Sequence, residues 1–131
     1  NVREKYVFPR MTEVVLERTF DLELAKKLVL EKNLDVLLSD SQYAFHINSR
    51  GIDKGTGFSE IMKRLSISRD DVIAIGDSAT DIPLFKVAKT SIALGNYSDY
   101  VKSHATMIVS ADAGDGVIEA LDKLAPKLSG V

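Results

Sequence analysis

From residue 54 to residue 124, the sequence alternates strictly between segments with helical spacing of apolar residues and short apolar segments. Residues 72–75 are wholly apolar and are followed by Gly76, which is typical of a strand buried on both faces of a sheet. Strands separated by amphipathic helices favour parallel pairing, since the chain must cross over to return to the same edge. We therefore expect an α/β fold in which residues 51–131 form a Rossmann-like parallel sheet core.

The expected elements of this region follow from the spacing of apolar residues. Helices are expected at 54–65, 82–88, 98–104 and 116–124, and further strands at 90–94 and 106–109.

Residues 1–50 follow a different order, strand, helix, strand, strand. The strands are expected at 11–17, 34–39 and 43–48, and the helix at 22–32 with Asp21 as its N-cap. A short polar turn between the last two strands predicts antiparallel pairing. We expect a small separate α/β unit, with the boundary in the loop 49–53. An exposed edge strand of this unit could pair two protomers in a homodimer.

Charge and composition exclude several classes of function. The 17 basic and 19 acidic residues give a formal net charge of −2, which argues against a broad electrostatic grip on nucleic acid or anionic membrane. The absence of cysteine excludes thiolate metal sites and cysteine nucleophiles. No apolar run approaches the about 20 residues that span a bilayer, and the first residues do not resemble a signal peptide. A cytoplasmic location is therefore the default expectation.

The segment that carries chemistry is Gly76-Asp-Ser-Ala-Thr-Asp81, directly after the apolar strand. Ligands of open parallel sheets gather at the carboxyl ends of strands, where Asp77 is expected. Asp81 follows four residues later, and the two carboxylates could converge on a hard cation such as Mg²⁺. Ser78 could donate a hydrogen bond to a metal ligand. Alternatively, Asp77 caps the following helix and Asp81 only complements its dipole.

These residues resemble a known family. Gly76-Asp-Ser-Ala-Thr-Asp-Ile-Pro-Leu-Phe85 is similar to the fourth motif of haloacid dehalogenase superfamily phosphatases, and Ile52-Asp-Lys-Gly55 resembles the third motif of the branch with a large α/β cap. Three further matches complete a resemblance that covers residues 46–122: Ala93-Leu-Gly-Asn96, Val101-Lys-x-x-Ala105 and Asp115-Gly-Val-x-x-Ala-Leu121. Within this branch, the short cap is most similar to that of the archaeal phosphoglycolate phosphatases. The resemblance implies that residues 1–50 are part of a cap domain.

The resemblance also implies roles by position. Asp77 and Asp81 correspond to acidic residues that help to hold Mg²⁺, and Lys54 corresponds to the lysine that contacts the substrate phosphate. A fixed ammonium stabilises the charge of a transferring phosphoryl group, although Lys54 could also be a surface residue at a helix start. Asn96 matches a residue at the rim of the active site that can touch the substrate, yet Gly95-Asn96 is equally good as a turn.

The nucleophile of this family, the first aspartate of an Asp-x-Asp motif after an apolar strand, is missing. We therefore expect that about 90 residues precede this chain in a longer protein. The longer protein is expected to hydrolyse a small phosphorylated acid or sugar through an aspartyl-phosphate, and this chain alone is expected to be inactive. In the cap part, Arg10, His46, Asn48 and Arg50 are candidates to reach the non-phosphate end of the substrate, although His46 could simply be packed or solvated.

Two other functions remain open on the sequence. A naturally short chain would be a non-catalytic module that binds Mg²⁺ or phosphate. A receiver-like domain would also carry aspartate and lysine at strand ends, but its lysine would follow the acidic cluster, whereas Lys54 precedes Asp77.

Overall fold

The computed structural model describes residues 1–6, 8, 10–95 and 98–128. The chain divides into two compact units, Asn1–Asp53 and Lys54–Val131. Among the described residues, no helix combines the length and the apolar character needed to cross a membrane.

The first unit is a three-stranded antiparallel sheet with one helix. Its elements are β1 (Glu13–Leu16), α1 (Leu22–Glu31), β2 (Val36–Asp40) and β3 (Phe45–Ser49), and the strand order is β1-β3-β2. The predicted order of elements and the antiparallel pairing of the last two strands are confirmed. Asp21 caps α1 as expected, since its carboxylate accepts a hydrogen bond from the Leu24 N–H at 3.0 Å. The Phe20 ring packs edge-on against the ring of Phe45 in β3.

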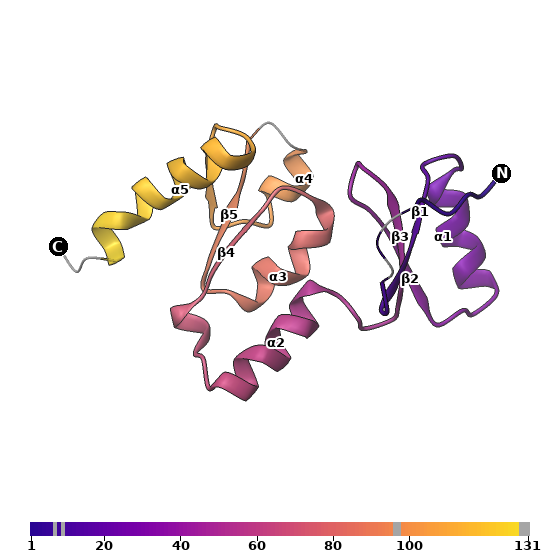
Figure 1. The fold of residues 1–131 in the computed structure, drawn as a ribbon, viewed down its shortest axis with the longest axis horizontal. Helices are drawn as coiled ribbons and strands as arrows, with labels where there is room; N and C mark the ends of the chain where they lie inside the picture. The colour runs from indigo at the N-terminus through magenta and orange to yellow at the C-terminus, as the bar shows by residue number, and fades with distance from the viewer. Residues whose placement is uncertain (7, 9, 96–97, 129–131) are drawn as a thin grey trace. The chain divides into compact units, whose positions relative to one another are not determined.

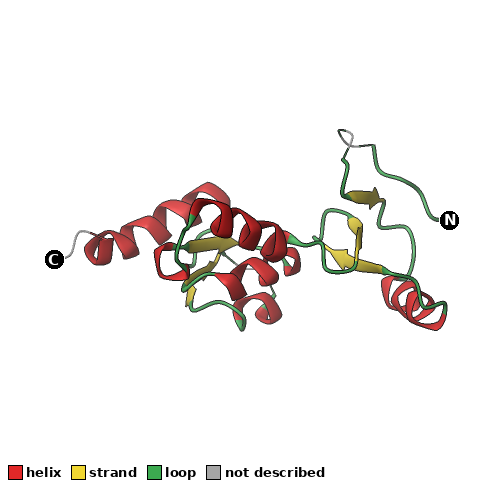
Figure 2. Cartoon of the chain, turned by 90° about the horizontal axis from the view of Figure 1, so that it is seen from below, coloured by secondary structure: helices red, strands yellow, loops and turns green. Residues whose placement is uncertain are grey.

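The second unit is a parallel sheet with strand order β4-β5-β6, as the alternating pattern predicts. Its helices α2 and α3 lie side by side (Figure 1), and its strands lie among its helices (Figure 2). In chain order the elements are α2 (Lys54–Leu65), β4 (Ile73–Gly76), α3 (Ile82–Val87), β5 (Thr90–Ala93), α4 (Asp99–Lys102), β6 (Met107–Ile108) and α5 (Ala113–Leu128), with short 3₁₀ turns at Arg69–Asp71 and Ala79–Asp81.

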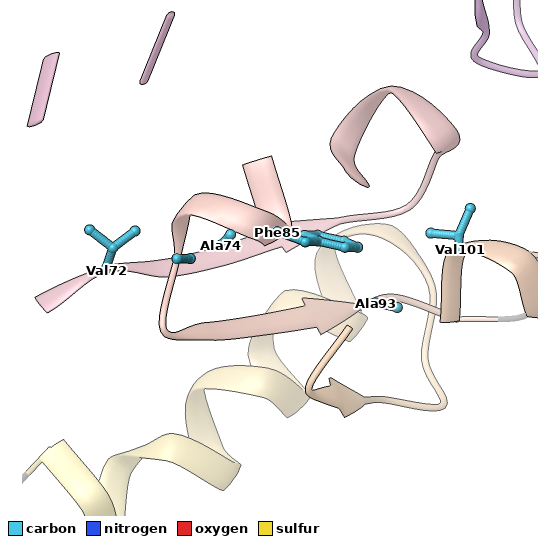
Figure 3. Packing of buried hydrophobic residues seen from close by; sticks show 6 residues of the cluster. Val72, Ala74, Phe85, Ala93 and Val101 are labelled. Atoms are coloured by element: carbon cyan, nitrogen blue, oxygen red, sulfur yellow. The ribbon is translucent and has the colours of Figure 1, made fainter. Parts of the chain in front are cut away.

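Each face of this sheet has its own apolar cluster. On one face, Ala74 and Ala93 pack with Phe85 of α3 and Val101 of α4 (Figure 3). On the other face, Ile92 packs against α5. The two sets of side chains come from alternating positions of the same strands, because neighbouring residues of a strand point to opposite faces. The residues of the second cluster are Ile92, Leu94, Val109, Ala120 and Leu124, with Ile75, Met107 and Val117 beside them.

One expectation for this sheet was wrong. Residues 72–75 were predicted to be buried on both faces, but Ile73 is 36% exposed. The reason is topological: among the described residues β4 pairs only with β5 and is therefore an edge strand. Val72 and Ala74 are buried as expected, since they face the first apolar cluster.

Candidate active site

The loop that carries the two candidate metal ligands begins where β4 ends at Gly76. It runs through the 3₁₀ turn Ala79–Asp81 directly into α3, whose second residue is Pro83. Proline is well tolerated in the first helical turn because the N–H groups there have no helical partner. The chain therefore turns sharply at the carboxyl end of the sheet, and Asp81 is left at the junction between the turn and the helix.

Asp81 is buried and its carboxylate holds this loop together. Its Oδ2 atom accepts hydrogen bonds from the Asp77 N–H and the Ser78 N–H, both at 3.0 Å, and from the Ser78 hydroxyl at 3.1 Å. Partial burial acts to raise the pKa of Asp81, but hydrogen bonds from Lys54, Ser78 and Asp77 outweigh it and hold the pKa below its ordinary value. Asp81 is therefore an ionised clamp on the backbone of residues 77–78.

Gly76 makes this clamp possible. A Cβ atom at position 76 would lie 2.5 Å from the Cβ of Asp81, closer than real Cβ atoms approach one another. Only glycine lets the Asp81 side chain fold back over the end of β4.

Lys54, the first residue of α2, forms an ion pair with the Oδ1 atom of Asp81. The two side chains differ in burial, with 55% of Lys54 and 8% of Asp81 exposed. The approach depends on Gly55, which is buried because α2 begins directly against the backbone of Pro83. The structure thus brings Lys54 and Asp81 together, although 26 residues separate them in the sequence.

Asp77 differs from Asp81 in its environment. It is half-buried at the tip of β4, and in the part of the chain that the structure describes its carboxylate has no hydrogen-bond or ion-pair partner. Across the described ranges, no group of three or more His, Asp or Glu side chains is placed to hold a metal ion. The local donors are carboxylate oxygens, the chemistry that Mg²⁺ requires, and Asp77 is the member of the pair whose oxygens remain available.

Ser78 lies where the sequence suggested, since its hydroxyl contacts both Asp81 and the Thr80 hydroxyl, the latter at 2.7 Å. Asn96, the candidate substrate contact, lies outside the described residues. The metal and substrate roles of Asp77, Asp81, Lys54 and Asn96 therefore stay predictions, while the geometry brings the first three to one edge of the sheet.

The polar candidates of the first unit are held by that unit's own residues. Both ring nitrogens of His46 are engaged, Nδ1 with Glu13 and Nε2 with Ser41, each at 2.9 Å. Asn48 donates to the Thr12 carbonyl at 3.3 Å and Arg50 to the Leu34 carbonyl at 3.3 Å, while Arg10 pairs with Glu13. Sequence reasoning missed Glu13 and Ser41, although strand alternation could have placed Glu13 on the His46 face.

Comparison with known proteins identifies the family of the chain. The family of haloacid dehalogenase-like hydrolases matches residues 12–121. A phosphoglycolate phosphatase of Nitrosopumilus maritimus is 81% identical over 129 residues, which cover 98% of this chain and 56% of that protein. A phosphoglycolate phosphatase of Methanosarcina acetivorans is 38% identical over 117 residues, 89% of this chain and 52% of that protein.

Among solved structures, a phosphatase of the haloalkanoate enzyme superfamily from Bacteroides thetaiotaomicron is similar, with a TM-score of 0.74 and 26% identity over 87% of this chain and 42% of that one. The chain spans about half the length of the curated relatives it matches. The family match includes residues 12–45 of the first unit, which the motifs found in the sequence alone, over residues 46–122, did not cover. This chain belongs to the haloacid dehalogenase-like hydrolases.

Proposed function

We propose that this chain is the C-terminal portion of a Mg²⁺-dependent phosphatase that hydrolyses a small phosphomonoester, 2-phosphoglycolate. The observation that carries the proposal is the group formed by Lys54, Asp81 and Asp77 at the carboxyl end of β4. The high identity to a relative named phosphoglycolate phosphatase supports the choice of substrate. In this proposal residues 1–50 belong to an α/β cap and residues 51–131 to the second half of the catalytic core.

The donor set fits a hard divalent cation. Asp77 would bind Mg²⁺ directly, because its carboxylate has no competing partner among the described residues and sits at the strand tip. Asp81 would act mainly by fixing the loop that presents Asp77, since its oxygens already accept bonds from that loop and from Lys54. When bound, the ion would neutralise negative charge on the phosphoryl oxygens.

Lys54 would hold the substrate phosphate. More than half of its side chain is exposed, so an incoming phosphate can reach the ammonium while Asp81 fixes its position. A preoriented cation of this kind stabilises charge that develops on the transferring phosphoryl group. By its correspondence to a family residue that can touch the substrate, Asn96 would add a hydrogen bond to the substrate.

The nucleophile would come from a segment that precedes residue 1 in the whole protein. Its carboxylate oxygen would form a bond to phosphorus while the bond to the leaving alcohol oxygen breaks, and water would then release phosphate from the aspartyl-phosphate. The length of the relatives, of which this chain covers about half, supports such a segment. This chain alone would then bind the ion or phosphate weakly without hydrolysing anything, as a non-catalytic fragment would.

The test is a phosphatase assay on the whole protein with 2-phosphoglycolate, a sugar phosphate and p-nitrophenyl phosphate, each with Mg²⁺ and with excess EDTA. We expect Asp77→Ala and Lys54→Ala each to lower kcat/KM by at least about 100-fold, the loss typical of removing an electrostatic catalytic group. The exposed Lys86 of α3 provides the matched control, Lys86→Ala, which should keep wild-type rates. Wild-type rates in Asp77→Ala and Lys54→Ala, or full activity in EDTA, would refute the assignment.

A further inference from the structure

A second group of reactive side chains lies in the first unit. In the register of β1 and β3, Val15 faces His46 and Glu13 faces Asn48, so Glu13 and His46 are diagonal neighbours on one face of the sheet. Ser39 of β2 faces His46 from the other side, and Ser41 follows two residues later in the turn to β3. Glu13, His46 and Ser41 therefore contact one another in series, with Glu13–Nδ1 and Nε2–Ser41 distances of 2.9 Å each.

The charge on Glu13 sets the direction of these hydrogen bonds. Burial acts to raise the pKa of Glu13, but hydrogen bonds from His46 and Arg10 outweigh it and keep the pKa below its ordinary value. An ionised carboxylate can only accept, so Nδ1 of His46 carries a proton and donates it to Glu13. With Nδ1 carrying a proton, a neutral ring would have its lone pair on Nε2, which faces the Ser41 hydroxyl.

The Ser41 hydroxyl can therefore donate to His46. Its other possible acceptor is the Ala44 carbonyl at 3.2 Å, which is more distant than Nε2. The His46 side chain is only 15% exposed and that of Glu13 13%, so both are held in place by the sheet. A hydroxyl, an imidazole and a half-buried carboxylate in this order are the parts of an activated serine.

We propose that Ser41 is a nucleophile that reacts with activated carboxylic esters, with His46 as its general base and Glu13 as the group that orients His46. Ser41 Oγ forms a bond to the carbonyl carbon, and its proton passes to Nε2 of His46. The bond to the leaving oxygen breaks, and the leaving phenolate or alkoxide takes the proton from His46. Water then hydrolyses the acyl-serine to a carboxylic acid and restores the hydroxyl.

The turn also limits the scope of this reactivity. Three of its N–H groups already have acceptors: Ser41 donates to the Ala44 carbonyl at 3.2 Å, Gln42 to Asp40 at 2.7 Å, and Ala44 to the Ser41 hydroxyl oxygen at 3.2 Å. These groups are therefore not available to stabilise an oxyanion, a contribution worth about 10²–10³-fold in rate. The expected substrates are activated esters such as aryl acetates, and amides are not expected to react. Acylation of Ser41 should be faster than hydrolysis of the acyl-serine.

The chain contains its own control. The second histidine, His104, also lies beside a serine, with 3.3 Å between Nδ1 and the Ser103 hydroxyl. Here Nδ1 of His104 and the Ser103 hydroxyl both contact the Tyr100 carbonyl, at 2.7 and 2.8 Å. A carbonyl can only accept, so both groups donate to it and His104 Nδ1 cannot serve as a base for Ser103.

The experiment uses the 131-residue chain and p-nitrophenyl acetate. Peptide mass spectrometry should find an acetyl ester on Ser41 and none on Ser103. Alkaline hydroxylamine should remove that ester while it leaves acetyl amides on lysines. His46→Gln should slow acetylation of Ser41 by about 100-fold, the usual contribution of a general base, and His104→Gln should leave it unchanged.

Two results would overturn the proposal: equal acetylation of Ser41 and Ser103 in the unmodified chain, or an unchanged rate at Ser41 in a folded His46→Gln variant. The first comparison needs no substitution, so it remains decisive if a variant does not fold. Neither result depends on phosphatase activity, so failure here leaves the proposed function untouched.

Discussion

Substitutions of the two aspartates of the β4–α3 loop are expected to differ in their effect on stability. Asp81→Ala leaves the buried Ser78 N–H and the half-buried Asp77 N–H without their acceptor. A buried unsatisfied donor costs about 1–3 kcal/mol, and the half-buried one costs less because water can replace the carboxylate. The lost ion pair adds about 0–1 kcal/mol, since Lys54 is more than half exposed. The expected loss of unfolding free energy is about 2–4 kcal/mol.

Asp77→Ala is the matched control, since it removes the same side chain from the same loop. Its carboxylate has no partner in the described part of the chain, so the free energy of unfolding should change by less than about 0.5 kcal/mol. Asp81→Asn should fall between the two, because its amide oxygen can still accept from the loop while its NH₂ group faces the Lys54 ammonium.

Native-state hydrogen exchange of the amides of β4 and β5 measures opening of the second unit directly, since these strands form its sheet. Protection factors should fall in Asp81→Ala by the amount that corresponds to about 2–4 kcal/mol. Equal protection in the Asp81→Ala and Asp77→Ala variants would refute the view that Asp81 clamps the loop.

Other predictions concern packing and pH. Gly76→Ala should destabilise the second unit by about 1–3 kcal/mol, because the new Cβ meets Asp81. Gly57→Ala in α2 has open space around the new Cβ and should stabilise the unit by about 0.4–1 kcal/mol. Equal urea midpoints for the two variants would contradict these opposite effects. Hydrogen bonds from Lys123 and from residues 110–111 lower the pKa of Glu119 from 4.5 to about 2. Its contribution to stability is therefore complete above pH 4.5 and is lost as the pH falls toward about 2. Thermal melts over this range should show a shallower pH dependence for Glu119→Gln than for the unmodified chain, and identical slopes would be evidence against the effect.

Periodicity predicted most of the fold. Helix α2 has the predicted limits, and the limits of the strands agree with the predicted ones to within two residues, because apolar spacing reports directly on the faces that pack. The 3₁₀ turns Arg69–Asp71 and Ala79–Asp81 were not predicted, since such short turns bury too few residues to leave a period. Helix α5 begins at Ala113, earlier than expected. Its first turn contains glycines, whose low helix propensity argues against a helix there.

The contacts of the Asp81 carboxylate could not be predicted from the sequence either. Spacing indicated a possible convergence of the Asp77 and Asp81 carboxylates on one cation, which stays a prediction. It could not indicate that the carboxylate of Asp81 turns back onto the N–H groups of residues 77–78, because that depends on the path of the turn. The ion pair with Lys54 depends on the packing of α2 against α3, which only the three-dimensional fold provides.

The formal charges at this edge suggest an order of binding in the proposed enzyme. Lys54 contributes +1, and Asp77 and Asp81 contribute −1 each, so the three side chains sum to −1. A phosphate monoester carries about −1.5 to −2 at neutral pH, so these side chains alone repel it. A divalent cation beside Asp77 changes the sum to +1 and reverses the sign of that interaction. Because Asp81 already neutralises Lys54, in the proposed enzyme the ammonium would position the phosphate while the cation would supply the net attraction. By linkage, phosphate must then strengthen binding of the cation by the same factor as the cation strengthens binding of phosphate.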